Sequence, residues 1–303
     1  MISKSQSGEN KVTKSRHKHQ WVLVQNELKI KCNDFECGKI EEIKNEPLHV
    51  LSLGVGVQTC YLLLKHPERY DIAIHSDIAN GDRENGEHDI TYWILDNIVQ
   101  PFCDKEGIAL WITEHPKGGV FHRAMKEKKL PVRSRRWCTQ DHKKDLNTWA
   151  IRKGLDADFP DNVIISDIGF SYDEYWRADG KGSTVRYNIL DYPLVNEKIT
   201  RQQCIDWLNE NYPIEINGNK IDWKDCKSGC WFCPYWKVSD LKKLSKERKE
   251  KIVKMEENSA HNITFKKKPM KVILGMDSHS LMDWTGSDEE EDDESCESGF
   301  CFV

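Results

Sequence analysis

Short apolar runs alternate with longer amphipathic segments in the first half of the chain. Four runs have the continuous apolar character of buried strands, namely HVLSLG (49–54), IAIHSD (72–77), IALWIT (108–113) and NVIISDIGFS (162–171). Other segments carry apolar residues at helical spacing, as in VQTCYLLLKH (57–66). Strands that alternate with helices predict an α/β fold with a parallel sheet and right-handed crossovers.

The pattern divides the chain into four parts. Residues 1–47 are expected to be a disordered or short β-rich N-terminal extension. Residues 48–182 hold the alternating strands and helices, and residues 183–275 form a cysteine-rich helical part of the same unit. Residues 276–303 include the acidic run DEEEDDE (288–294) and are expected to be a disordered tail.

Charge and composition narrow the class of protein. The 303 residues include 45 Lys and Arg against 50 Asp and Glu, and removing the seven acids of 288–294 changes the net charge from −5 to +2. The chain therefore has no overall excess of positive charge that would argue for nucleic-acid binding. No apolar run approaches the roughly 20 residues that span a bilayer, and the N-terminus lacks a signal-peptide core. We expect a cytoplasmic protein without a membrane partner, whose eleven cysteines serve metal or redox chemistry.

SLGVGVQTC (52–60) connects the first buried strand to a helix. Gly54 and Gly56 permit positive φ and close backbone approach, and Thr59 offers a hydroxyl at the helix start. Backbone N–H groups in such a turn can hold a phosphate, although a turn that binds nothing is equally common. Asp77 and Asp167 end two predicted strands, where they could line a ligand crevice or serve as turn residues.

Three cysteines, Cys226, Cys230 and Cys233, lie within eight residues at C-x3-C-x2-C spacing. Thiolates at this spacing suit zinc or an iron–sulfur centre. A four-ligand site needs another thiol, for which Cys138 and Cys204 are the candidates. The alternative is a set of buried or free thiols.

The segment RSRRWCTQDHKK (133–144) contains five Lys and Arg residues. It could bind phosphate or sulfate, or it could be a solvated basic helix start. Two groups of residues carry weaker signals. The first, His17, His19, Cys32 and Cys37, could bind zinc, but we favour no metal there. The second, Cys296 and Cys301, could be a redox pair or a mobile thiol.

Five motifs in this order resemble the phosphoadenosine phosphosulfate (PAPS) reductase-like family of the PP-loop, or adenine nucleotide α-hydrolase, superfamily. They are SLGVGVQTC (52–60), RRWCTQDHK (135–143), IGFSYDEYWR (168–177), YPLVNEKITRQQC (192–204) and KSGCWFCPY (227–235). The likeness covers about residues 48–257 and is greatest to the phage and prokaryotic branch. It implies a doubly wound, Rossmann-like α/β domain that binds ATP or PAPS, with Mg²⁺ as an accompanying ion.

The resemblance also implies roles for individual residues. The nucleotide would be bound by Ser52, Gly54, Gly56, Val57, Gln58, Thr59 and Asp77. A 4Fe–4S cluster, with zinc as the alternative, would be bound by Cys138, Cys204, Cys230 and Cys233, with Cys226 as a spare ligand. Lys143 and Arg136 would be catalytic and hold the anionic end of the substrate. The usual PP-loop has an aspartate where this chain has Gln58, which departs from the family pattern.

The implied function is that of a transferase or reductase of sulfur metabolism. ATP pyrophosphatase chemistry would activate an oxygen of a nucleic-acid or protein acceptor, which sulfur then replaces. One alternative is PAPS reduction by the tail thiol of Cys301, although the acids at 288–294 and Glu297 should raise the pKa of that thiol. Another is a non-catalytic module that binds nucleotide and metal, which Gln58 favours.

Overall fold

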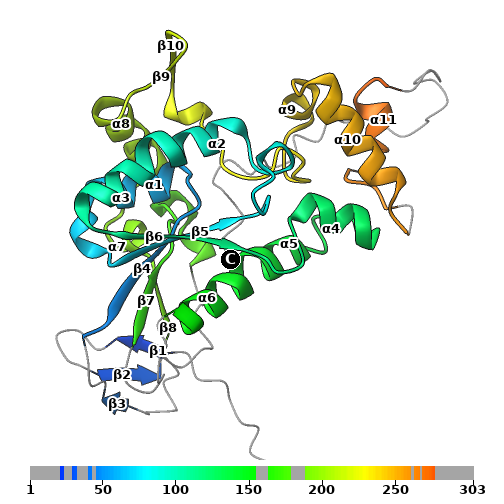
Figure 1. Cartoon of the computed structure of the whole chain (residues 1–303). Helices are drawn as coiled ribbons and strands as arrows, with labels where there is room; N and C mark the ends of the chain where they lie inside the picture. The colour runs from blue at the N-terminus through cyan, green and yellow to red at the C-terminus, as the bar shows by residue number, and fades with distance from the viewer. Residues whose placement is uncertain are drawn as a thin grey trace, which may run out of the picture.

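The computed structural model describes residues 21–23, 29–32, 40–42, 46–154, 163–178, 188–260, 263–266 and 268–276. A five-stranded sheet is formed by β4 (Leu48–Ser52), β5 (Ile72–Asp77), β6 (Ala109–Glu114), β7 (Ile164–Asp167) and β8 (Asn188–Asp191). Its order is β6-β5-β4-β7-β8, and all four pairings are parallel (Figure 1). The predicted α/β fold with a parallel, Rossmann-like sheet is therefore confirmed.

Helices connect these strands and continue after them. The α-helices are α1 (Val57–Lys65), α2 (Asp89–Ile94), α3 (Gln100–Glu106), α4 (Val120–Glu127), α5 (Trp137–Thr139), α6 (Leu146–Gly154), α7 (Pro193–Asn196), α8 (Arg201–Asn211), α9 (Val238–Lys242), α10 (Lys246–Glu257) and α11 (Met270–Ile273). Short 3₁₀ turns are η1 (Pro67–Arg69), η2 (Arg83–Asn85), η5 (Tyr172–Arg177) and η6 (Trp223–Asp225), and π-helical turns are η3 (Leu95–Val99) and η4 (Gln140–Asp145). Two small antiparallel sheets contain β1 (Trp21–Leu23), β2 (Lys29–Cys32), β3 (Ile40–Glu42), β9 (Ile214–Ile216) and β10 (Asn219–Ile221).

The strand order reverses between β4 and β7. The chain builds β4, β5 and β6 outward in one direction and then returns to place β7 on the other side of β4. Helix α1 packs against α8 on one face of the sheet, and α6 lies on the other face against β5 and β6 (Figure 1). Open α/β sheets bind ligands beyond the carboxyl ends of the strands at such a reversal.

Among the described residues, a small apolar cluster with Val50 and Ile74 lies between the sheet and α6, and two larger clusters account for most of the core. One lies between α1, α8 and the sheet and includes Leu53 and Leu208. The second joins α4, α10 and the loop of residues 227–237, here called the cysteine-containing loop, through Val120, Trp231 and Met255. The cysteine-containing loop thus packs on a core of its own, beside the sheet and not beneath it.

Some boundaries differ from the sequence-based expectation. Strand β7 ends at Asp167, so residues 168–171 lie beyond it. Strand β8 was not predicted, because it has only four residues, of which Ile189 alone is fully buried. Thr200 caps α8, in a reciprocal capping box with Gln203.

Several predicted features fall outside the described residues. These are the tail beyond Met276 and the side chains of His17, His19, Cys32, Cys37, Cys296 and Cys301. Within the part of the chain that the structure describes, no helix has the length and apolar character needed to cross a bilayer.

Candidate functional site

The turn between β4 and α1 is strained at Val55. We expected positive φ at Gly54 or Gly56, but the valine between them has it, with φ of 52°, while Gly56 is extended at −97°. A β-branched residue with positive φ is disfavoured, and such outliers are concentrated at functional sites. The Val55 side chain is fully buried in the core beside α1, which offsets part of this strain.

Gly56 allows the close approach that the sequence predicted. A Cβ at this position would lie 2.7 Å from the Ser228 Oγ atom, so the turn touches the cysteine-containing loop directly. No side chain caps α1, and its first turn contains no acid, so its N-terminal N–H groups keep their positive partial charge. The Thr59 hydroxyl donates to the Gly56 carbonyl at 3.2 Å and braces the turn. This N-terminus suits phosphate oxygens.

Gln58 takes part in a buried hydrogen-bond network. Its Nε2 atom donates to Glu174 Oε2 at 3.3 Å and to Ser171 Oγ at 3.5 Å. Arg177 Nη1 in turn donates to Glu174 Oε1 at 2.8 Å. A carboxylate thus lies one hydrogen bond from position 58, on a residue that the sequence did not single out. IGFSYDEYWR contains it, but nothing in that motif indicates a partner 116 residues earlier in the chain.

Asp77 closes the turn that follows β5. Its carboxylate accepts the N–H groups of Ala79 at 2.9 Å and Gly81 at 2.8 Å, and also the Tyr92 hydroxyl at 3.4 Å. These contacts favour the interpretation of Asp77 as a turn residue over its interpretation as a residue that lines the ligand crevice. Its oxygens stabilise the backbone beside the crevice.

Asp167 is fully buried near Arg69 and Asp191. Its Oδ2 atom lies 3.4 Å from Arg69 Nη2, which also approaches Asp191 Oδ2 at 3.5 Å. Burial, followed by the charge of Asp191, raises the pKa of the Asp167 carboxyl to about 6 and outweighs the guanidinium. This residue is therefore better explained by the interior of the fold than by the crevice.

Asp167→Asn should make stability less dependent on pH. Because the folded pKa lies above the ordinary 3.8, the stabilising effect of this carboxyl is complete below about pH 4 and is lost as the pH rises through about 6. Across that window the unfolding free energy of the wild type should fall by about 3 kcal/mol relative to the variant. Urea denaturation of both proteins at pH 4 and pH 7 measures this difference. Parallel pH dependence of the two proteins would contradict it.

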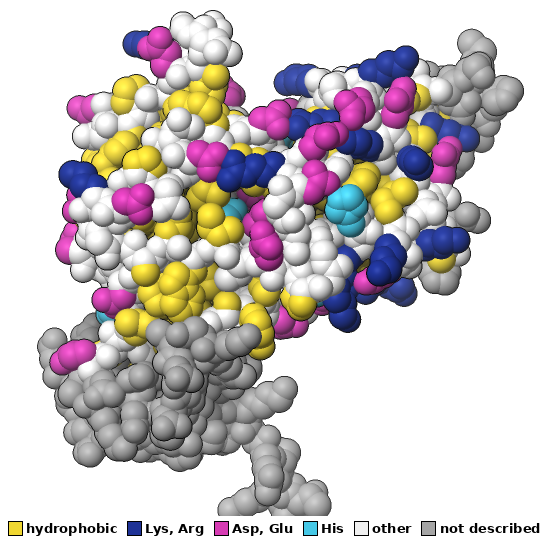
Figure 2. Space-filling model, viewed as in Figure 1, with side chains coloured by type: hydrophobic (Ala, Val, Ile, Leu, Met, Phe, Trp, Pro, Cys, Tyr) yellow, Lys and Arg dark blue, Asp and Glu magenta, His cyan; other side chains and the backbone are white. Residues whose placement is uncertain are grey.

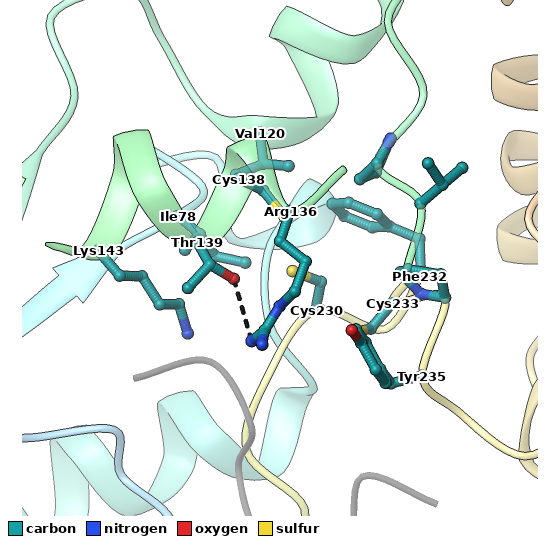
Figure 3. A pocket seen from close by; sticks show the side chains of 13 residues that line it. Ile78, Val120, Arg136, Cys138, Thr139, Lys143, Cys230, Phe232, Cys233 and Tyr235 are labelled. Carbon is teal, nitrogen blue, oxygen red and sulfur yellow. Dashed lines mark hydrogen bonds between the residues drawn. The ribbon is translucent and has the colours of Figure 1, made fainter. Parts of the chain in front are cut away.

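Two pockets adjoin one another around Lys143. The first, here called the strand-end pocket, encloses about 620 Å³ between the sheet and α6. Its lining consists of Ser52, Lys143, Lys144, Asn147, Thr148, Ile151, Ser166, Ile168, Asn188, Leu190 and Tyr192. The second, here called the thiol pocket, has about 460 Å³ of open space (Figure 3). Its lining consists of Ile78, Val120, Pro131, Val132, Arg136, Cys138, Thr139, Lys143, Cys230, Phe232, Cys233, Pro234 and Tyr235.

Lys143 is a buried cation between these two pockets. Its Nζ atom lies 3.5 Å from Glu87 Oε1, and the side chains of both residues are at most 5% exposed. Arg136 Nη2 donates to Thr139 Oγ1 at 3.4 Å, and Figure 3 shows the Lys143 and Arg136 side chains extending to the same side of the helix. Lys143 and Arg136 thus place two basic groups on the wall of the thiol pocket.

His142, next to Lys143, is buried and neutral. Its Nε2 atom accepts from Arg123 Nη1 at 2.9 Å, and its ring stacks on His115 with centroids 4.4 Å apart. Burial, together with the charges of its neighbours, lowers the pKa of His142 to about 3. This imidazole therefore positions the segment that carries Lys143 and does not exchange protons near neutral pH.

The structure brings three of the four predicted metal ligands together. Cys138, Cys230 and Cys233 line the thiol pocket, but Cys204 packs in the other core, against α1. The fourth expected ligand is thus separated from the other three, because Cys204 lies on the apolar face of α8 with Ile205 and Leu208. Cys226 also belongs to that core, and its thiol donates to the Asp222 carbonyl at 3.6 Å.

The predicted four-cysteine set therefore does not fit a 4Fe–4S cluster. Among the described residues, no three His, Cys, Asp or Glu side chains are arranged to hold a metal ion. The three thiols at the pocket could be part of a zinc or iron–sulfur site only with a fourth donor other than Cys204. No catalytic step is derived through such a group.

Brief alkylation of the native protein should label Cys138 and Cys233 first, because both are only half-buried. Burial raises the pKa of Cys204 and Cys226 to about 12, so these thiols should react only after unfolding. Pulse labelling with N-ethylmaleimide followed by mass spectrometry measures the order. A metal bound at the thiol pocket would protect Cys138 and Cys233 until a chelator is added. Early labelling of Cys204 would contradict its placement in the core.

The remaining candidates can now be placed. Ser52 lines the strand-end pocket and Arg136 lines the thiol pocket. Gly54, Gly56, Val57, Gln58, Thr59 and Asp77 belong to the turns beside the pockets and line neither of them. No protein-family model matches the chain, and no curated protein matches it. The resemblance to the PAPS reductase-like family therefore rests on the five sequence motifs.

Proposed function

We propose that this protein is a PP-loop enzyme that binds an adenine nucleotide and uses ATP in sulfur-transfer chemistry. The observation that supports this most is the shared position of Lys143, which borders both the strand-end pocket and a pocket with three thiols. The strand-end pocket lies at the reversal of the strand order, where Ser52 at the end of β4 and Ser166 of β7 both line it.

The reaction proposed is activation of an acceptor followed by substitution. An acceptor oxygen attacks the α-phosphate of ATP, and pyrophosphate leaves with the electron pair of the broken P–O bond. A sulfur nucleophile then displaces AMP from the activated carbon or phosphorus centre. The reaction needs a sulfur donor, which we identify only by class, as inorganic sulfide. Its sulfur forms the new bond to the acceptor while AMP leaves with the activated oxygen.

The residues of this chain would bind and orient the phosphates. The N-terminus of α1 offers N–H groups beside the turn at Val55, and Lys143 and Arg136 offer cations. Positive groups held in place at a departing pyrophosphate stabilise the charge that develops there. Mg²⁺ would accompany the nucleotide, with no ligand assigned to it.

A second candidate function is a non-catalytic nucleotide-binding module. The observation that favours it is the network at Gln58, in which the amide is held by Glu174 and no acid stands in the turn. PAPS reduction by a tail thiol depends on Cys301, which lies outside the described residues.

Calorimetric titration with ATP and with PAPS tests the proposal at its first step. One equivalent of ATP should bind, more tightly than PAPS, in buffer containing Mg²⁺. Preference for PAPS would instead support the reductase alternative. Absence of heat with either nucleotide, in protein shown to be folded, would overturn the nucleotide-binding function.

A further inference from the structure

Charge is separated along the molecule although the chain as a whole is close to neutral. Residues 117–144 contain ten Lys and Arg against two Asp and Glu, and residues 237–254 contain eight against three. Residues 67–107 contain three Lys and Arg against ten Asp and Glu. Figure 2 shows Lys and Arg side chains gathered over the part of the molecule that contains α4, α9 and α10. This part, here called the basic lobe, presents a positive field that the net charge conceals.

Some cations of the basic lobe are neutralised within the protein. Arg248 contacts Asp89 at 2.6 Å, and Lys251 pairs with Glu84, so α10 is fastened to the acidic segment after β5. Arg123 is paired with Glu127 and Asp141. These contacts are explained by the fold.

Three other cations of the basic lobe are not paired with acids in this way. Lys126, Lys128 and Arg135 are exposed, and they contact no acid among the described side chains. They lie on α4 and on the segment that follows it, which continues to Arg136 at the thiol pocket. The unneutralised positive charge is thus concentrated beside the opening of a cavity.

An aromatic ring accompanies the cations at this cavity. Tyr235 lines the thiol pocket, and the guanidinium carbons of Arg133 and Arg136 both lie 5.2 Å from its ring centroid. Lys129 lies 5.2 Å from the ring centroid of Trp137. Cations interleaved with aromatic rings match a strand of phosphates and bases, whereas an acidic peptide would use the cations alone.

We propose that the surface formed by residues 126–136 and Tyr235 binds a single-stranded nucleic acid, with one base stacking at Tyr235 beside the opening of the thiol pocket. The phosphates contact Lys126, Lys128 and Arg135, and the base lies against the partly exposed ring of Tyr235. A reaction on that strand rests on the proposed function, but the binding itself does not.

Fluorescence anisotropy with a short labelled single strand, in the absence of ATP, tests the binding. Lys126→Glu/Arg135→Glu should weaken affinity at least about tenfold at low salt and flatten the salt dependence, because fewer counterions are released. The control Lys105→Glu/Lys220→Glu makes the same change in charge at two exposed lysines outside the basic lobe. It should bind within about twofold of the wild type. If both double variants weakened binding equally, the loss of affinity would be explained by net charge alone. That result would overturn the proposed binding surface.

An abasic strand of the same length separates base stacking from charge. It should bind roughly tenfold more weakly than the strand with bases, and Tyr235→Leu should remove that difference. Equal affinity of the two strands would overturn the stacking of a base on Tyr235. Poly-glutamate that binds as tightly as the oligonucleotide would assign the surface to an acidic protein partner instead. If the single strand does not bind while calorimetry still shows ATP binding, the proposed nucleic-acid surface is wrong and the proposed nucleotide-dependent function is unaffected.

Discussion

Lys143→Met should lower the turnover of ATP by at least about 100-fold, a loss of roughly 3 kcal/mol of transition-state stabilisation. The side chain is buried between the strand-end and thiol pockets, where its charge is poorly screened by solvent. Methionine retains most of the volume and removes only the charge. The matched control is Lys117→Met, because that exposed lysine lines neither pocket. It should retain turnover within about fivefold.

Stability must be separated from chemistry in this variant. Removing the ammonium group takes from buried Glu87 a cation at 3.5 Å, which should destabilise the fold. Lys143→Met/Glu87→Gln should recover thermal stability without recovering turnover. Recovery of both would show that Lys143 acts only through the packing of Glu87.

Gly56→Val should weaken ATP binding by at least about 100-fold, because the turn or the Ser228 side chain must move and the start of α1 becomes crowded. A Cβ at residue 56 would lie 2.7 Å from Ser228 Oγ, and the branched side chain would add two methyl groups at the start of α1. The same displacement should change the alkylation rate of Cys233, which shares its loop with Ser228. Calorimetry and pulse labelling measure the two effects.

The control for this steric argument removes the opposing atom. Ser228→Gly alone should bind ATP as the wild type does, and Gly56→Val/Ser228→Gly should recover part of the lost affinity. A double variant no better than Gly56→Val would show that the valine acts by covering the phosphate-binding N–H groups directly. Wild-type affinity in Gly56→Val would place the nucleotide away from this turn.

The sequence was sufficient to predict the parallel sheet. β5 and β7 are buried apolar runs that end in Asp, and such runs need no long-range information to be recognised. β6 has the same apolar character but is an edge strand that is largely exposed, which the run alone did not indicate. Strand β8 was not predicted, because its sequence NILD is short and mostly half-buried. The positive φ of Val55 could not be predicted, since glycine flanks it and only tertiary packing enforces the strain.

The candidate site was predictable only in part. Cys138, Cys230 and Cys233 were expected together and line one pocket. Close spacing places Cys230 and Cys233 on one loop, whereas Cys138 comes from α5 and meets them only through the fold. Cys204 was expected with them, yet its spacing to Ile205 and Leu208 already indicated a buried helix face. Glu174 became visible only in three dimensions, through its contact with Gln58. The separation of positive and negative charge between segments was not recognised from the sequence, because these segments cancel in the net charge of the whole chain.

Release of pyrophosphate from ATP tests the central claim most directly. Purified full-length protein would be incubated with Mg²⁺, ATP labelled at the α- or γ-phosphate, a sulfide donor and a single-stranded nucleic acid. The products would then be separated by chromatography. The account predicts equal amounts of pyrophosphate and AMP, at a rate that Lys143→Met lowers by about 100-fold. Inorganic phosphate and ADP as products, or pyrophosphate formed equally well by that variant, would contradict it.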